Sequence, residues 1–521
     1  NDVYVDAMLS YNKEIKDFSV SASAGWVGHT VKGETQKLWT RATYFSYTDM
    51  NQLPTRINFF EPLASWGGSN MNEYSLSSNW DKGLFFTGQV GYKDYVYLEG
   101  SYRQDWYRAF KQFEYRGTPD NYGYFSVGAN TLMHRYISLP EFITHLKLRA
   151  SYSEVGNSIP NEVFNKGKAD LATGAIASST YGYFDNPIPE TSKSFEAGFD
   201  VSFFDSSLNW DLTYYHTGLY NNYFLQATTG GKSKPVNTGL IRNQGIETTV
   251  SYSLGFAKDW MWRTSVNFSY NDNKIVKTFK DEQGKSSKLE QKIAGGNIVV
   301  RYDEGGSYGD MYALDFRRND DGSIYLSSNG APQLSNNSYV YLGNMNSKFQ
   351  LGWGNTISWK DLSLYFLVSG RIGGKVISLT EAYLDYQGVS KRVGDARLAA
   401  EANPDLQWNG KPAMVMPDGN LAPIEEYYKA VGGNMFGSQY VYDATNFRLA
   451  ELSLGYSFHN LFGGVISNLS LSVVGRNLFF IYKDAPVDPD IALSTKNGLG
   501  AFDIFNMPAT RSVGVNLKID F

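Results

Sequence analysis

The chain of 521 residues contains no cysteine and no long apolar run. Without a thiol it can form no disulfide, no thiolate nucleophile and no cysteine-based zinc site. Mean hydropathy is -0.36, and no stretch approaches the roughly 18 apolar residues that a membrane-spanning helix needs. Basic residues do not outnumber acidic ones, because the net charge is -5. This balance argues against a nucleic-acid partner.

Groups suited to catalysis are also scarce. The five histidines show no pairing at metal-ligand spacing. Gly231-Lys232-Ser233 lacks the leading glycine of a phosphate-binding loop, because Gln226 stands at that position. The pair Glu425-Glu426 fits a solvated loop better than a general acid and base. We therefore predict that the chain is not an enzyme.

Aromatic residues and glycine are abundant. The chain has 38 Tyr, 32 Phe and 11 Trp, which together make 16% of the residues, and 51 Gly. Aromatic residues at this level are typical of the interfacial girdles of membrane β-barrels, and glycine is typical of bends and tight turns. Composition therefore favours a barrel that crosses a membrane with strands.

The end of the chain alternates without interruption. Val513, Val515, Leu517, Ile519 and Phe521 fall on one face of a strand, and Asn516, Lys518 and Asp520 fall on the other. We predict that the first face meets lipid and the second lines a lumen, because the opposite register would place two charges in hydrocarbon. A closing strand with a terminal Phe also resembles the signal that barrel-assembly machinery reads.

Fifteen strands are predicted. They cover 3–13, 16–28, 83–93, 94–107, 121–132, 143–154, 192–205, 206–219, 239–255, 258–272, 345–359, 361–373, 445–459, 466–480 and 509–521. In 143–154, His145, Lys147 and Arg149 alternate with Leu146 and Leu148. A packed soluble core would not tolerate such charges unpaired, whereas a water-filled interior accepts them.

The connections between these strands are alternately short and long. The short ones lie near 13–15, 92–94, 133–142, 204–206, 256–259, 360–361 and 460–465, and the long ones cover 29–82, 108–120, 155–191, 220–238, 273–344, 374–444 and 481–508. Outer-membrane barrels have short periplasmic turns and long extracellular loops. We therefore expect the C-terminus in the periplasm and Asn1 at the outer rim. Because single-chain barrels have even strand counts, we also expect an incomplete barrel.

A family resemblance covers essentially the whole chain. It rests on the order and spacing of short motifs: Gly91–Leu98 (GYKDYVYL), Tyr122–Ala129 (YGYFSVGA), Leu146–Tyr152 (LKLRASY), Gly156-Asn157, Pro189–Ser194 (PETSKS), Glu196–Asp200 (EAGFD), Asn243–Glu247 (NQGIE), Phe447–Leu449 (FRL), Leu454–Tyr456 (LGY), Gly475–Leu478 (GRNL), Asp488–Asp490 (DPD) and Thr510–Ser512 (TRS). Together they resemble the SusC-like (SusC/RagA) TonB-dependent outer-membrane transporters.

This resemblance implies an all-β, transmembrane antiparallel barrel of 22 strands, filled by an N-terminal plug, energised by TonB and covered by a SusD-like lipoprotein. Residues 1–521 would then be the C-terminal portion of the barrel, about 15 strands, with seven strands and the plug missing. No secretion signal stands at Asn1, so we expect the signal to have been removed or to lie on a missing upstream part. We expect the plug and the seven missing strands to be supplied by another segment. The assembled barrel would lie in the outer membrane of a Gram-negative bacterium. The family also suggests a dimer of transporter and lid pairs.

The expected cargo is a bulky nutrient, an oligosaccharide ahead of an oligopeptide. Sugars stack on aromatic rings, and the predicted loops hold aromatic clusters, although any single ring of this kind is more often an interfacial girdle or loop-packing residue. The candidate substrate-binding residues are Tyr181, Tyr183, Phe184, Tyr220, Tyr223, Phe224, Tyr383 and Tyr386, with Tyr427 and Tyr428 beside them. Two alternatives stay open: a passive porin-type channel and a surface assembly scaffold.

Two further expectations concern the long loops. Residues 155–191, 273–344 and 374–444 should lie outside the cell and contact the lid, because ordered loops of that length need a partner. Family members often carry a D-x-N-x-D-G calcium loop, and the matching stretch here starts with Arg317. Arg317 would repel the ion, so an Asp-Gly turn is favoured over calcium held by Asn319 and Asp321.

Overall fold

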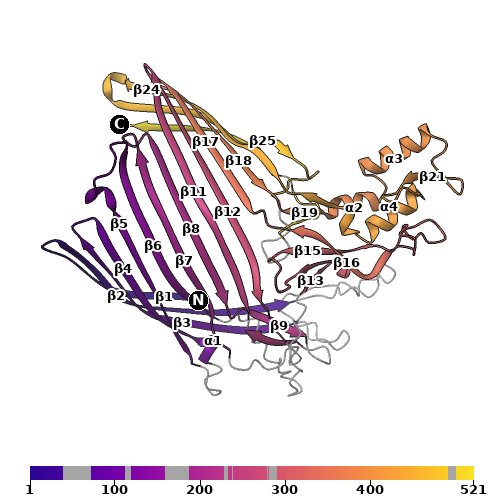
Figure 1. Ribbon diagram of the computed structural model, residues 1–521, viewed down its shortest axis with the longest axis horizontal. Helices are drawn as coiled ribbons and strands as arrows, with labels where there is room; N and C mark the ends of the chain where they lie inside the picture. Colours follow the sequence, from indigo (N-terminus) through magenta and orange to yellow (C-terminus); the bar gives the residue numbers. More distant parts are fainter. Residues whose placement is uncertain are drawn as a thin grey trace, which may run out of the picture.

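The structure is a computed structural model that describes residues 1–38, 72–111, 119–158, 187–227, 233–237, 239–278, 280, 290–490, 500–507 and 509–521. A curved antiparallel sheet dominates it, and a smaller folded body projects from one end of the sheet (Figure 1). No helix in the described ranges is long and apolar enough to cross a membrane.

The large sheet, here called the wall, has fifteen strands within the described ranges, as predicted. They are β1 (Asp2–Ile15), β2 (Phe18–Leu38), β3 (Asn72–Tyr92), β4 (Val96–Tyr107), β5 (Asn121–Leu132), β6 (Ile143–Asn157), β7 (Glu190–Phe203), β8 (Leu208–Tyr220), β11 (Leu240–Ala257), β12 (Trp260–Lys277), β17 (Phe349–Trp359), β18 (Leu362–Ile372), β24 (Asn446–Leu461), β25 (Ile466–Lys483) and β27 (Ser512–Asp520). Each pairs with the next in chain order, and β1 and β27 do not pair with each other in the described part of the chain. The two edges therefore form no small closed barrel.

The alternation of short and long connections is also confirmed. Short turns join β1 to β2, β3 to β4, β5 to β6, β7 to β8, β11 to β12, β17 to β18 and β24 to β25. Several of these turns use left-handed backbone, for example at Lys16, Asp259 and Lys360, where φ is 56°, 67° and 50°. Left-handed residues match the twist of two-residue hairpins. The described strand ends that flank the long connections lie at the opposite end of the wall.

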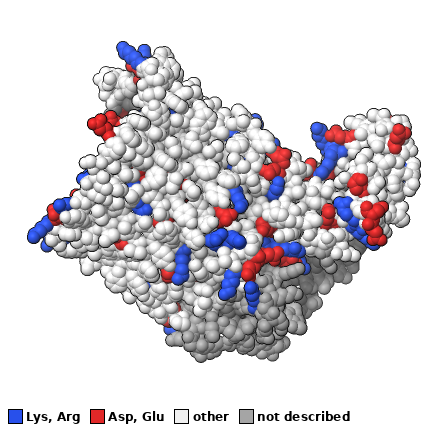
Figure 2. Space-filling view, in the orientation of Figure 1, with Lys and Arg blue, Asp and Glu red and all other residues white. Residues whose placement is uncertain are grey.

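Strand register gives the wall two chemically different faces, since directly opposed residues of antiparallel strands share a face. One row across seven strands is wholly apolar: Val515, Val473, Leu454, Leu364, Ile357, Trp262 and Leu254. A row on the other face is polar except for Gly198: Asn130, Arg149, Gly198, Thr213, Glu247, Ser269, Gln350, Arg371 and Asn446. In Figure 2 few charged side chains lie over the middle of the sheet, and more gather at its border and over the smaller body.

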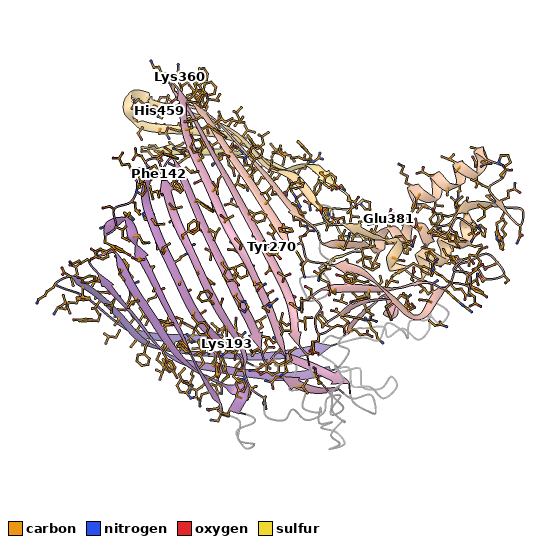
Figure 3. The ribbon with its side chains drawn as sticks, in the orientation of Figure 1. Phe142, Lys193, Tyr270, Lys360, Glu381 and His459 are labelled. Carbon is orange, nitrogen blue, oxygen red and sulfur yellow. The ribbon has the colours of Figure 1, made fainter. Side chains whose placement is uncertain are left out.

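Aromatic rings collect at the turn end of the wall. Trp260 and Trp359 stack with centroids 5.7 Å apart, and Phe18 lies 5.0 Å from Tyr92. Phe142, labelled in Figure 3 near this end, lies 6.2 Å from the ring of Phe203. Aromatic residues at the margin of an apolar band are typical of the membrane–water interface. The turn end therefore has the chemistry of an interfacial girdle.

The smaller body, here called the loop module, comprises residues 290–348, 373–445 and 500–507. It contains a sheet of β13 (Glu290–Ile293), β14 (Ile298–Arg301), β15 (Asp310–Phe316) and β16 (Leu334–Asn344), and a second of β19 (Lys375–Ser378), β23 (Val441–Asp443) and β26 (Phe502–Asp503). A third holds β20 (Gln407–Trp408), β21 (Lys411–Val415) and β22 (Leu421–Pro423). Among the described residues, three α-helices complete it: α2 (Leu379–Tyr386), α3 (Lys391–Ala402) and α4 (Ile424–Gly433). Outside the wall and the module, the described residues also form α1 (Arg108–Lys111) and the hairpin of β9 (Tyr223–Ala227) and β10 (Ser233–Asn237).

Local sequence explains the helices of the module. The Ser378 hydroxyl accepts a hydrogen bond from the Glu381 amide at 3.2 Å, and Ser390 does the same for Val393 at 3.2 Å. These serines cap the exposed amides at the start of α2 and α3. The module also has one apolar core, to which Ile298, Met311, Ile377, Ala382, Val431, Phe436, Tyr440 and Phe502 contribute. The fold class is confirmed, but the predicted loops 273–344 and 374–444 are largely a packed module.

Candidate functional site

The polar face of the wall carries a cavity of about 580 Å³. Its lining alternates carboxylates, hydroxyls and amides along neighbouring strands: Asp211, Thr213, Glu247, Thr249, Asn267, Ser269, Gln350, Arg371, Asn446 and Asp490. Arg149 from β6 donates to Asp211 at 2.8 Å and to the Thr213 hydroxyl at 2.6 Å. Such a surface is suited to water and polar solutes rather than to hydrocarbon.

A segment after β25 bends onto this polar face. Arg371 forms an ion pair with Asp490 at 2.9 Å, and Asn446 donates to the same carboxylate at 3.3 Å. Arg448 contacts Asp490 as well, and its guanidinium lies 3.7 Å from Asp488. The motif Asp488-Pro489-Asp490 is therefore fixed against the wall by two arginines from neighbouring strands.

A larger cleft lies where the wall meets the loop module. Its volume is about 1130 Å³. One side consists of the loop ends of β7, β8, β11 and β12, and the other of the sheet β13–β16 and the segments beside it. Amides and phenols are prominent in the lining: Asn222, Tyr223, Asn243, Asn271, Asn273, Gln291, Tyr302, Tyr308, Tyr341, Asn344 and Asn346.

The segment Tyr302–Asp310, here called the tongue, is attached to the end of β12. The Ile275 amide donates to the Gly306 carbonyl at 2.9 Å, and the Gly305 amide donates back to the Ile275 carbonyl at 2.8 Å. Asn273 accepts from the Tyr308 amide at 2.6 Å and donates to Asn243 at 2.7 Å. Wall and tongue thus share one hydrogen-bond network.

Two phenol rings of the tongue line the cleft. The centroids of Tyr302 and Tyr308 are 5.0 Å apart, with an angle of 46° between the ring planes. Burial raises the pKa of both phenols. For Tyr341, burial followed by the nearby Asp310 carboxylate raises the pKa to about 12. All three hydroxyls therefore stay protonated near neutral pH and can donate hydrogen bonds.

Most carboxylates of the cleft are satisfied within the protein. Asp272 pairs with Lys348 at 2.9 Å, and Glu290 pairs with Arg301 at 3.5 Å. Buried Asp310 accepts from Tyr341, Asn344 and the Ser307 amide at 3.1, 2.8 and 2.8 Å. Lys274, Glu190 and Asp310 line the cleft without an ion pair in the described ranges, and Glu190 accepts a hydrogen bond from the Tyr223 amide at 2.8 Å. The cleft thus offers mainly neutral groups.

The predicted aromatic residues do not form one site. Tyr223 lines the cleft, whereas Tyr220 lies in a separate pocket beside Pro187 and Lys193. Tyr383 and Tyr386 are exposed on α2, where Tyr383 meets Phe505 edge to face at 5.3 Å. Tyr181, Tyr183, Phe184 and the side chain of Phe224 fall outside the described residues. As a substrate site, this set remains a prediction.

Tyr427 and Tyr428 are placed elsewhere. Both belong to the core of the loop module and are only 3% and 7% exposed. A sugar ring cannot reach them, so the suggestion that they bind cargo is wrong, and loop packing describes them correctly. Their spacing explains this position, because α4 turns one apolar stripe toward the core: Ile424, Tyr427, Tyr428 and Val431.

Sequence reasoning missed the residues of the tongue. Tyr302 and Tyr308 lie within the predicted loop 273–344, with Gly305 and Gly306 between them. A pair of tyrosines flanking two glycines was the available signal, since glycines allow a tight turn that presents both rings. Asn273, which binds the tongue, could not be recognised from the sequence, because it comes next to the tongue only in the folded chain.

Whether the loop around Asn319 and Asp321 binds calcium stays a prediction. Asp321 accepts hydrogen bonds from the Ser323 amide and hydroxyl at 2.9 and 2.6 Å, and Asn319 donates to Ser323 at 2.9 Å. These contacts form an Asx-type turn with Gly322 at a φ of 87°. Among the described residues, no group of three or more His, Cys, Asp or Glu is arranged to hold a metal ion.

Comparison with known proteins gives a consistent result. Residues 3–478 match the family model described as TonB dependent receptor-like, beta-barrel. The "TonB-dependent receptor P3" of Formosa agariphila is 24% identical over 98% of this chain and 51% of its own length. "TonB-dependent receptor SusC" of Bacteroides thetaiotaomicron is 21% identical over 69% of this chain and 36% of its own. These relatives are receptors and not enzymes, which agrees with the prediction.

A solved structure shares the fold. The "RagAB peptide importer in the 'open-open' state" superposes with a TM-score of 0.71 at 16% identity, over 100% of this chain and 54% of that one. The chain spans about half the length of two of its relatives, 51% of "TonB-dependent receptor P3" and 53% of "TonB-dependent receptor P39", both of Formosa agariphila.

Proposed function

Because the chain belongs to the TonB dependent receptor-like β-barrel family, we propose that it forms part of an outer-membrane transporter that imports a bulky nutrient. The observation that carries this proposal is the two-faced wall. An apolar row across seven strands meets the requirements of lipid, and the polar row behind it suits a water-filled conduit. The loop module would lie outside the cell and the turn end in the periplasm.

The barrel is proposed to have 22 strands, fifteen of them from residues 1–521. The support is the unpaired outer edges of β1 and β27 in the described residues, together with the fraction of each relative that the chain covers. In lipid, each unsatisfied backbone group at such an edge costs several kcal/mol. Further strands would satisfy both edges. A plug would occupy the polar side of the wall, and TonB would act on that plug.

A SusD-like lipoprotein is the proposed lid, and the loop module is its proposed support. The module has its own core and an exposed aromatic surface at Tyr383, Tyr386 and Phe505. Surfaces of this kind are typical of partner contacts. Pairs of transporter and lid would associate as a dimer.

Oligosaccharide is the preferred cargo class, and oligopeptide is the alternative. Amides and phenols along the cleft and hydroxyls along the wall suit the hydroxyl groups of a sugar chain. The name of the RagAB structure refers to peptide import, which keeps peptides open for this chain as well.

Uptake in cells tests the proposal. A deletion strain should lose growth on one class of oligosaccharide or peptide as sole nutrient, and a plasmid copy should restore it. Loss of TonB should abolish the same growth, because import against a gradient needs energy. A passive porin would support growth without TonB, and a surface scaffold would leave growth unchanged after deletion. Either result would reject active import.

A further inference from the structure

We propose that the cleft between the tongue and the wall is a docking site for an uncharged oligosaccharide segment, with Tyr302 and Tyr308 as its stacking residues. The inference rests on the proposed function and extends it to named residues. The volume of about 1130 Å³ is slightly above the ~300–1,000 Å³ of typical small-molecule sites. The cleft therefore fits several linked units better than one small molecule.

The rings are held in place before any ligand arrives. Asn273 accepts from the Tyr308 amide at 2.6 Å, and the backbone pair between Ile275 and the glycines 305 and 306 holds the base of the tongue. Asn344 and Asn346 donate to the Tyr308 carbonyl at 3.1 and 2.9 Å. A ring on such a support loses little conformational freedom on binding, which favours affinity.

Hydrogen-bonding groups beside the rings remain available. The side-chain oxygen of Asn222 is buried and has no partner in the described part of the chain. The amide nitrogens of Asn243 and Asn271 make no hydrogen bond to a described residue, although their oxygens accept from Asn273 and Tyr215. A buried amide oxygen without a partner costs free energy. Sugar hydroxyls can both donate and accept, so they could satisfy all three groups.

The charges of the cleft favour a neutral ligand. Asp272 and Glu290 pair with Lys348 and Arg301. Asp310 and Glu190 accept hydrogen bonds from neighbouring donors. A charged cargo would have to displace these partners or leave its own charge uncompensated in a partly buried site. Lys274 offers one cation to an acidic sugar, and this makes a uronate chain the natural comparison.

The cleft also leads toward the polar side of the wall. Asn243 and Asn271 lie on the same strand face as Glu247, Ser269 and Asn267, which line the wall cavity. Alternate residues of β11 and β12 therefore carry polar groups from the cleft to that cavity. A sugar chain docked at the tongue would lie at the entrance of the proposed conduit.

Binding to the purified full-length protein tests the inference. Calorimetric titration would use three classes of probe: neutral hexasaccharides of glucose, mannose and xylose, a uronate hexasaccharide, and an uncharged hexapeptide. Tyr302→Ala and Tyr308→Ala should each weaken neutral-sugar binding about tenfold, because each removes one stacking ring. Tyr308→Phe keeps the ring and should stay within about threefold of the unmodified protein. The matched control is Tyr325→Ala, since Tyr325 stacks on Arg317 at 4.2 Å and does not line the cleft.

The outcomes separate this inference from the proposed function. Neutral-sugar binding that falls in the two alanine variants but not in Tyr308→Phe or Tyr325→Ala supports the cleft. Equal affinity in all variants, or tighter binding of the uronate or the peptide, overturns it, while growth defects of the deletion strain would still support import. If the deletion strain grows normally on every nutrient, the proposed function itself is wrong.

Discussion

Adjacent residues of β25 allow a direct test of the two faces of the wall. Leu471 lies opposite Leu517 and Tyr456 on the apolar face, and Ser472 lies opposite Asn516 and Gly455 on the polar face. Leu471 is five residues beyond Ile466, where the strand begins. At ~3.3 Å per residue and a tilt of about 40°, it stands roughly 13 Å from the turn end. That height is close to the middle of an apolar band about 25 Å tall.

Leu471→Arg should therefore cost about 2–4 kcal/mol of folding free energy, the penalty for a cationic side chain near the bilayer midplane. Ser472→Arg should cost much less, because the polar face of the wall already carries Arg149 and Arg371. Urea titration of the full-length protein folded into lipid vesicles would measure both. Equal penalties, or a larger penalty for Ser472→Arg, would refute the assignment of the faces.

Three other predictions concern the end of the chain and the loop module. Deleting Phe521 should lower the yield of assembled barrel in the outer membrane several-fold, and an unchanged yield would remove the terminal aromatic residue from the assembly signal. Asp385→Asn should destabilise the loop module by roughly 3 kcal/mol, the low end for a broken buried ion pair, because the side chain of Arg392 is a third exposed. Buried Asp385 pairs with Arg392 at 2.8 Å and accepts a hydrogen bond from Tyr440 at 2.9 Å. Limited proteolysis would detect the loss, and Glu425→Gln on the exposed side of α4 should leave the cleavage pattern unchanged. Burial alone would raise the pKa of Asp443, but hydrogen bonds from Thr445 and Lys375 outweigh it and hold the pKa below its usual value. The resulting stabilisation is present above the unfolded-state pKa of about 4 and is lost as the pH falls through the folded-state pKa. In an acid titration, Asp443→Asn should therefore lose less folding stability than the unmodified protein.

The strands of the wall could be predicted from the local sequence pattern alone. A strand with one face in lipid and the other in water must alternate at every second residue, so segments such as 143–154 and 509–521 identify themselves in isolation. The short turns at Lys360 and Asp259 follow from the same alternation. Strand ends were less accurate: β2 continues to Leu38, ten residues beyond the predicted end, because nothing in the sequence marks where the strand leaves the membrane.

The loop module could not be predicted in the same way. Its core joins Ile298, Ile377 and Phe502, which lie more than 200 residues apart at the extremes, and such contacts leave no short-range pattern. The helices did carry signals in Ser378 and Ser390, but these caps were not recognised in segments expected to be loops. The cleft depends on the meeting of Asn273 with Tyr308, so it appears only once the fold is known.

Labelling of single cysteines tests the central claim most directly, because this chain contains no thiol of its own. Leu398→Cys places a thiol on exposed α3 of the module, and Phe462→Cys places one at the turn end between β24 and β25. A membrane-impermeant maleimide added to intact cells should label position 398 and should label position 462 only after the outer membrane is permeabilised. Labelling of 462 in intact cells, or protection of 398 in cells stripped of the lid, would contradict a wall that spans the outer membrane with its module outside.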